Sequence, residues 1–130
     1  MNAQKKITQN MYVVGDTSTS DVSKNLTVVK NKASEKEEAK TALQLMTISL
    51  SVALNSYASQ YKLYGLGRKF HYNYENVAVL NDNELLEVAS QVLEAVAEYE
   101  SDLWKYDVNR KTILSFLNTM SVFQFLISLP

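Results

Sequence analysis

Hydrophobic side chains recur every three or four positions in three long stretches of this 130-residue chain, the spacing of a helix face. The first stretch predicts a helix over about 35–64, because Ser34 and Glu37 have the spacing of a capping box at its start. Residues 47–52 also alternate between polar and apolar, as strands do, but the strong helix formers before them favour helix. The expected packing face holds Leu43, Met46, Leu50, Ala53, Tyr57 and Tyr64.

The second stretch, over about 82–107, has the most regular pattern in the chain. Asn81 and Glu84 again have the spacing of a capping box, which predicts the start of this helix. Apolar positions then follow in steps of three and four, and glutamates occupy another side of the same helix. A seam of this kind predicts helix-on-helix packing at a shallow crossing angle. The expected seam is formed by Leu85, Val92, Val96, Tyr99, Leu103 and Tyr106.

The third stretch predicts a helix over about 110–129, with Asp107 or Asn109 as its cap. Its apolar residues cover nearly all faces toward the end, and no charged residue occurs over 112–129. We therefore expect this helix to be covered by the same chain, by another copy or by lipid. The hydrophobic end includes Phe116, Phe123, Phe125, Leu126 and Ile127.

Residues 1–33 are polar, and we expect them to form an arm that is flexible or becomes ordered on a partner. Two short β-prone runs, 11–14 and 26–29, offer a loose hairpin as the alternative. The helical domain is then expected over 34–130.

The stretch 64–76, YGLGRKFHYNYEN, connects the first two predicted helices. Gly65 is suited to the left-handed conformation that closes a helix, with Leu66 folding back in a Schellman motif. Beyond it, the alternation of Phe70, Tyr72 and Tyr74 with polar residues predicts a short β-like connector with one aromatic face.

Arg68 and Lys69 precede that aromatic face, so Arg68, Lys69, Phe70, Tyr72 and Tyr74 form a candidate interaction surface. Three interpretations stay open: packing at the end of a bundle, contact with a protein, and single-strand nucleic-acid binding through 62–74. A phosphate loop is not favoured, because the glycines follow a predicted helix and not a strand.

Composition excludes several classes of chemistry. The chain has no cysteine and one histidine, so thiol catalysis and zinc sites with several imidazoles or thiolates are ruled out. His71 has no evident catalytic partner, and the row Glu87, Glu94, Glu98 and Asp102 is typical of a solvated helix face. We predict no catalytic residue, no metal site and no cofactor. The net charge of −1 provides no general attraction to nucleic acid, although residues 81–130 carry eight carboxylates against three cations.

The sequence thus predicts a mainly α fold: an antiparallel helical bundle, or a helical hairpin plus a third helix, with a polar arm and an aromatic connector. The expected function is that of a non-enzymatic structural or adaptor protein in an oligomeric assembly, with protein partners that include itself. By analogy alone, the component of a virion or a secretion machine fits this description. The alternatives are a membrane-active helical protein and a weak single-strand nucleic-acid binder. The N-terminus has no run of signal-peptide length, so we expect cytoplasmic synthesis.

Overall fold

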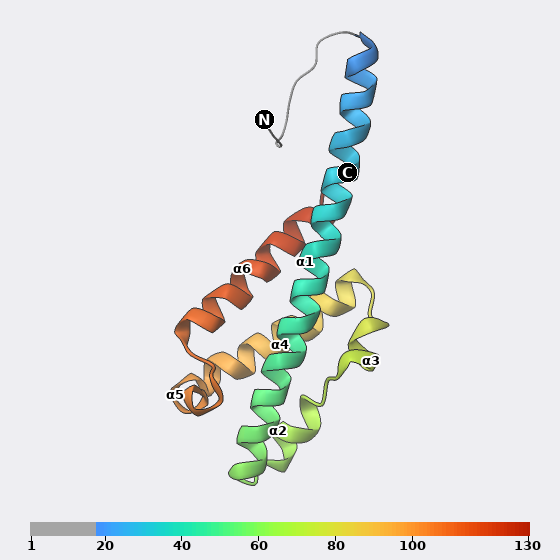
Figure 1. Cartoon of the computed structure of the whole chain (residues 1–130). Coiled ribbons are helices and arrows are strands. Elements are labelled where there is room, and N and C mark those ends of the chain that lie inside the picture. The colour runs from blue at the N-terminus through green and yellow to red at the C-terminus, as the bar shows by residue number, and fades with distance from the viewer. Residues whose placement is uncertain (1–17) are drawn as a thin grey trace. The chain divides into compact units, whose positions relative to one another are not determined.

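The computed structural model describes residues 18–130, which are mainly helical and contain no β-strand, so the mainly α character of the predicted fold is confirmed. Residues 36–130 form one compact unit, and the packing described below is that of this unit. Figure 1 labels the helices α1 to α6, and a short 3-10 helix, η1, precedes α6. The bounds are α1 Ser18–Gln60, α2 Tyr64–Lys69, α3 Tyr74–Ala78, α4 Asp82–Glu98, α5 Glu100–Leu103, η1 Trp104–Tyr106 and α6 Arg110–Ile127.

One hydrophobic core joins side chains from α1, α4 and α6. The seam predicted on the second helix lies in it, with Leu85, Val92, Val96 and Leu103 fully buried. Tyr99 and Tyr106 pack against the core half-buried. The helices α4 and α6 contact each other, and each fully buried Leu, Val or Phe stabilises the fold by about 1.5–3 kcal/mol. The other fully buried apolar side chains are Leu43, Leu54, Val77, Ala89, Phe116 and Phe123.

Residues 47–52, whose sequence fits both the alternation of a strand and the spacing of a helix, are helical. Thr47 and Ser51 are fully buried, whereas Ser49 between them is exposed. A strand would place all three on one face, so burial at an interval of four identifies a helix. The hydroxyl of Thr47 donates a 2.6 Å hydrogen bond to the carbonyl of Leu43, which compensates for its burial.

The predicted start of the first helix is wrong. It begins at Ser18, so residues 26–29 are helical and the hairpin alternative fails for that run. The other run, 11–14, lies outside the described residues. Ser34 is inside α1, where backbone N–H groups already have partners in the preceding turn, so its capping-box spacing marks no terminus.

The end of the first helix also lies earlier than predicted. Lys62, with φ of 59°, is the left-handed residue, and no described glycine has a positive φ. The amide of Leu63 donates to the carbonyl of Ala58 at 2.7 Å, and the amide of Lys62 to that of Ser59 at 3.3 Å. These two bonds make a Schellman motif, and half-buried Leu63 supplies its hydrophobic contact. The motif therefore stands three residues before the predicted one, and Gly65 belongs to α2 instead.

The expected β-like connector is two short helices, α2 and α3. Asn73 caps α3 in a capping box with Asn76, with two 2.9 Å hydrogen bonds between each side chain and the other's amide. The preceding turn is tied to α1, because the side-chain amide of Asn55 donates to the carbonyl of Phe70. Local capping therefore overrides the alternation of aromatic residues.

The second predicted helix is broken near its end. The α4 helix starts as predicted, with the Glu84 amide donating to Asn81 at 2.8 Å, but it ends at Glu98. After α5 and η1, Asp107 takes the left-handed conformation with φ of 64° and the amide of Val108 donates to the carbonyl of Leu103 at 3.2 Å. Asn109 then caps α6 by accepting from the amide of Thr112 at 3.0 Å. Of the two predicted caps, Asn109 is confirmed, whereas Asp107 closes the preceding turn.

Candidate interaction surfaces

The surface predicted from the aromatic connector is divided by the structure. Phe70 is only 3% exposed and belongs to the core, and Tyr72 packs against the core half-buried. Arg68 and Lys69 are exposed in the last turn of α2, and Tyr74 is exposed at the start of α3. The ammonium of Lys69 lies 5.5 Å from the centroid of the Phe70 ring, a cation–π contact that covers the core edge. The five residues therefore do not form one continuous aromatic face.

The histidine and the glutamate row considered in the sequence lie on the surface. His71 is exposed, and its backbone carbonyl accepts a hydrogen bond from the side chain of Asn76. Glu87, Glu94 and Glu98 are exposed on α4. Within residues 18–130, no three His, Asp or Glu side chains are grouped closely enough to hold a metal ion.

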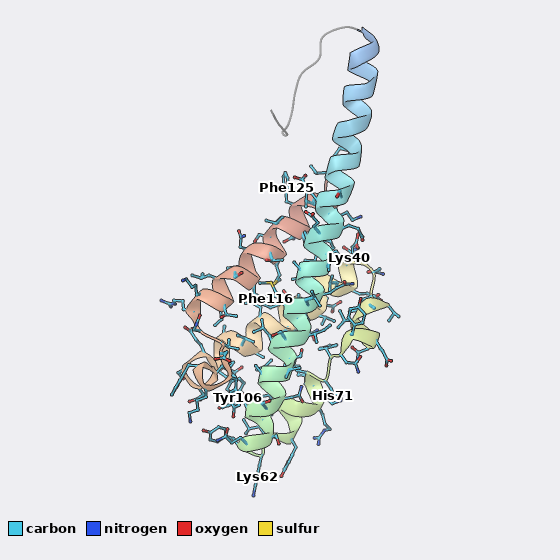
Figure 2. All side chains as sticks on the ribbon, in the orientation of Figure 1. Lys40, Lys62, His71, Tyr106, Phe116 and Phe125 are labelled. Carbon is cyan, nitrogen blue, oxygen red and sulfur yellow. The ribbon has the colours of Figure 1, made fainter. Side chains whose placement is uncertain are left out.

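The helix α6 has two distinct apolar faces. Its inner face packs into the core through Phe116 and Phe123, with half-buried Ile113, Met120 and Ile127 beside them. The opposite face leaves four large apolar side chains exposed: Leu114 at 57%, Leu117 at 44%, Val122 at 42% and Phe125 at 63%. Asn118 and Ser121 lie between the two pairs on that face, and both are exposed. Figure 2 shows Phe116 near the middle of α6 and Phe125 toward its C-terminal end. We call Leu114, Leu117, Val122 and Phe125 the outer face of α6.

A cluster of tyrosines joins the end of α1 to the segment between α4 and α6. The ring of Tyr57 lies 5.0 Å from that of Tyr61 and 5.2 Å from that of Tyr99, measured between centroids. The hydroxyl of Tyr106, labelled in Figure 2, donates to the side chain of Gln60. The ammonium of Lys105 donates to the hydroxyl of Tyr61 at 3.1 Å. These contacts hold α5 and η1 against the last two turns of α1.

The electrostatics of this cluster follow from its contacts. The pKa of Tyr57 is raised by burial and, next, by its hydrogen bond to the Asp102 carboxylate. The pKa of Lys105 is raised by its hydrogen bond with Tyr61 and by the nearby charge of Asp102. Both groups carry their protons at neutral pH already at their ordinary pKa values of 10.0 and 10.5, and the shifts act only in the alkaline range.

Beside the cluster, an open cleft of about 460 Å³ lies between the end of α4 and the start of α6. Buried Val108 and exposed Ala97 provide apolar lining, and Trp104, 64% exposed, provides an aromatic one. Its other lining residues are Glu98, Glu100, Ser101, Asn109 and Arg110. We call this the Trp104 cleft.

The outer face of α6 was predicted only in part, because the hydrophobic end named from the sequence contains Phe125 but not Leu114, Leu117 or Val122. The Trp104 cleft was not predicted. The signal for the cleft was available: Trp104 is a large apolar residue adjacent to Leu103, one position off the predicted seam. Such a residue points outward when the seam is buried, and an exposed tryptophan needs an explanation. The cleft itself depends on the break after Glu98, which the regular seam concealed.

No helix within residues 18–130 combines the length and the hydropathy that crossing a bilayer requires. Comparison with protein-family models, with characterised proteins and with solved structures finds no match to this chain.

Proposed function

We propose that this chain is a non-enzymatic structural or adaptor protein that acts through helix-mediated contacts, and that the outer face of α6 is its contact with a second copy. The observation that supports it is the apolar character of α6 on two opposite sides. Packing explains the inner face, whereas the outer face exposes four large apolar side chains on one helix. Exposed apolar groups gathered in this way are typical of surfaces that another molecule covers.

A second copy fits the outer face because its residues are arranged symmetrically along the helix. Leu114 and Phe125 are equidistant from the midpoint between Thr119 and Met120, and so are Leu117 and Val122. Two copies of α6 packed antiparallel about that midpoint bring Leu114 against Phe125 and Leu117 against Val122, twice each. A two-fold contact requires this kind of self-complementary surface.

The polar and charged residues are compatible with the same arrangement. Asn118 and Ser121 are also related by that midpoint, so their side chains meet at the centre of the contact and can exchange hydrogen bonds. A polar pair at such a place fixes register at some cost in stability. Because residues 112–129 carry no charge, the paired helices oppose no like charges.

The test is solution mass by light scattering, with Phe125→Glu as the disrupting variant. The wild-type protein is expected as a dimer, and Phe125→Glu as a monomer that keeps the wild-type helix content by circular dichroism, since the side chain is exposed in the single chain. Val79→Glu is the matched control, because Val79 is 80% exposed after α3 and outside the contact. This control is expected to remain a dimer.

A charge exchange tests the antiparallel register. Leu114→Lys alone also weakens the dimer, but the double variant with Phe125→Glu places opposite charges together at both ends and restores it. A parallel pair would bring each position against itself and would show no restoration. A wild-type monomer at all concentrations contradicts the proposal. If that monomer binds to liposomes, lipid and not a second copy covers the outer face, and the membrane-active alternative replaces the dimer proposal.

A further inference from the structure

The Trp104 cleft combines features that packing within the chain leaves unused. None of its lining residues belongs to the outer face of α6, so the inference below does not depend on self-association. Its volume of about 460 Å³ is within the roughly 300–1,000 Å³ range of ligand pockets. Being open, it suits a side chain presented by another molecule better than an enclosed small ligand.

The charge of the cleft is negative. Glu98 and Glu100 line it, against Arg110 as its cationic lining residue. The Nε atom of Arg110 is 3.8 Å from the nearer Glu100 oxygen, and its side chain is 80% exposed. An ion pair this long and this exposed to water contributes little, so both carboxylates are available to a ligand.

One of the two carboxylates, that of Glu98, also opposes the dipole of its own helix. Glu98 is the last residue of α4, whose final turn contains Glu98 and no basic residue. The C-terminal end of a helix carries a partial negative charge, and an acidic side chain there is destabilising by about 0.3–1 kcal/mol. A cation bound in the cleft would relieve this repulsion, because it would neutralise the carboxylate and the exposed carbonyl groups together.

Trp104 supplies the third element. The neighbouring Leu103 and Val108 are buried and anchor the segment that presents it, while the indole stays exposed. Lys105 lies 6.0 Å from the indole centroid, and its ammonium also contacts Tyr61, so this cation belongs to the tyrosine cluster. An exposed, rigidly held tryptophan beside carboxylates attracts a planar cation by stacking and by its quadrupole.

We propose that the Trp104 cleft binds an arginine side chain of a protein partner, with the guanidinium stacked on Trp104 and hydrogen-bonded to Glu98 or Glu100. The guanidinium matches a carboxylate with two parallel hydrogen bonds and stacks on aromatic faces, whereas an ammonium does neither as well. Phosphate ligands are disfavoured, because two carboxylates line the cleft against one guanidinium.

Intrinsic fluorescence tests the proposal directly, because Trp104 is the only tryptophan in the chain. Titration with a blocked tetra-arginine peptide is expected to change the emission in a saturable way, and added salt is expected to weaken this binding. A tetra-lysine peptide of the same charge is expected to bind several-fold more weakly, and a tetra-glutamate peptide not at all.

Carboxylate variants locate the binding. Glu98→Gln and Glu100→Gln are each expected to raise the dissociation constant for tetra-arginine about threefold to tenfold. Glu87→Gln makes the same change on α4 outside the cleft and is expected to leave the dissociation constant unchanged. Melting curves of Glu87→Gln and Glu100→Gln should match the wild type, whereas Glu98→Gln should melt slightly higher because it removes a charge that opposes the dipole of α4.

The proposal is overturned by any of three results. The first is that the emission of the wild-type protein fails to respond to tetra-arginine. The second is that tetra-lysine binds as tightly as tetra-arginine. The third is that Glu87→Gln weakens binding as much as the cleft variants do. The last result would indicate general attraction to an acidic surface.

Discussion

The phenol of Tyr57 donates a 3.1 Å hydrogen bond to a carboxylate oxygen of Asp102, and this bond joins α1 to α5 across 45 positions of sequence. It is one of the contacts that fix the segment between α4 and α6 against the end of α1. Because α4 ends at Glu98, α5 is not part of a long helix. Without these contacts to α1, only its own short turn and buried Leu103 would hold it in place.

Tyr57→Phe and Asp102→Ala should therefore be non-additive. Each single change is expected to lower the midpoint of urea unfolding, and the double variant to lose less than the sum of the two, because both remove the same bond. Pairing Tyr57→Phe with Glu87→Ala, an exposed carboxylate on α4, provides the additive control. Additive losses at Asp102 would mean that the bond carries no coupling energy.

The raised pKa of Tyr57 sets the direction of an alkaline effect. Because the folded state holds the phenolic proton more tightly, the stabilisation is complete below the ordinary pKa of 10.0 and is lost as pH rises through the folded value. In Tyr57→Phe this contribution is absent, so the difference in stability between variant and wild type should narrow above pH 10.0. A constant difference would contradict the shift.

Asp82, the first residue of α4, makes a corresponding prediction on the acid side. Its two carboxylate oxygens are each 3.0 Å from an ammonium, one of Lys36 and one of Lys40, and the hydrogen bond from Lys40 is the main cause of its lowered pKa. We expect Asp82→Asn to cost about 1 kcal/mol at neutral pH, including the loss of a favourable charge at a helix N-terminus.

The sign of the pH dependence follows from that lowered pKa. The stabilisation is present above the ordinary carboxyl pKa of 3.8 and is lost as pH falls through the folded value. Urea unfolding of wild type and Asp82→Asn, measured from neutral pH downward, should converge below 3.8. Glu84→Gln, which keeps its side-chain oxygen for the capping box, is the control variant at the same helix start.

Ser51 is a fully buried serine whose hydroxyl has no hydrogen-bond partner within the described part of the chain. Burying an unpaired hydroxyl is unfavourable, so Ser51→Ala is expected to raise the free energy of unfolding by about 1 kcal/mol. Ser49 is two positions earlier, on an exposed side of the same helix. Ser49→Ala therefore changes helix propensity alone and is expected to raise the free energy of unfolding by about 0.5 kcal/mol. Equal gains at both positions would show that burial of the Ser51 hydroxyl costs nothing.

Two non-glycine residues occupy the left-handed conformation, and they should respond differently to glycine. The left-handed conformation is unfavourable for lysine, which lacks the short polar side chain that eases it in aspartate. Lys62→Gly is therefore expected to stabilise the fold by about 1 kcal/mol. Asp107→Gly should gain less, because aspartate tolerates this conformation better. Thermal melting of the two variants checks the order, and Gly65→Ala, in a helix with open space around its Cβ position, should be tolerated.

The parts of the fold that follow from short-range chemistry were predictable from the sequence. The capping box of Asn81 with Glu84 and the cap at Asn109 depend on residues three apart, and both start their helices as predicted. The buried faces of α4 and α6 follow from the spacing of their apolar residues. Burial of Leu43 and Leu50 on α1 follows in the same way.

The predictions that were wrong concern places where local sequence signals compete. Ser34 and Glu37 have the spacing of a helix start, but α1 continues through them from Ser18. Gly65 was the natural residue to close α1, yet Lys62 does so because Leu63 then reaches the core. Likewise, Tyr99 continues the spacing of the seam while the backbone leaves α4, so periodicity alone gave no sign of the Trp104 cleft.

The absence of ionisable groups over 112–129 has a consequence for control in solution. Nothing on the outer face of α6 can titrate, and salts that are excluded from apolar surfaces strengthen contacts of that kind. Ionic attraction at Glu98 and Glu100 is weakened by the same salts. If both surfaces act as proposed, the concentration of such a salt is a single variable that tightens the pairing of copies while it releases a basic partner.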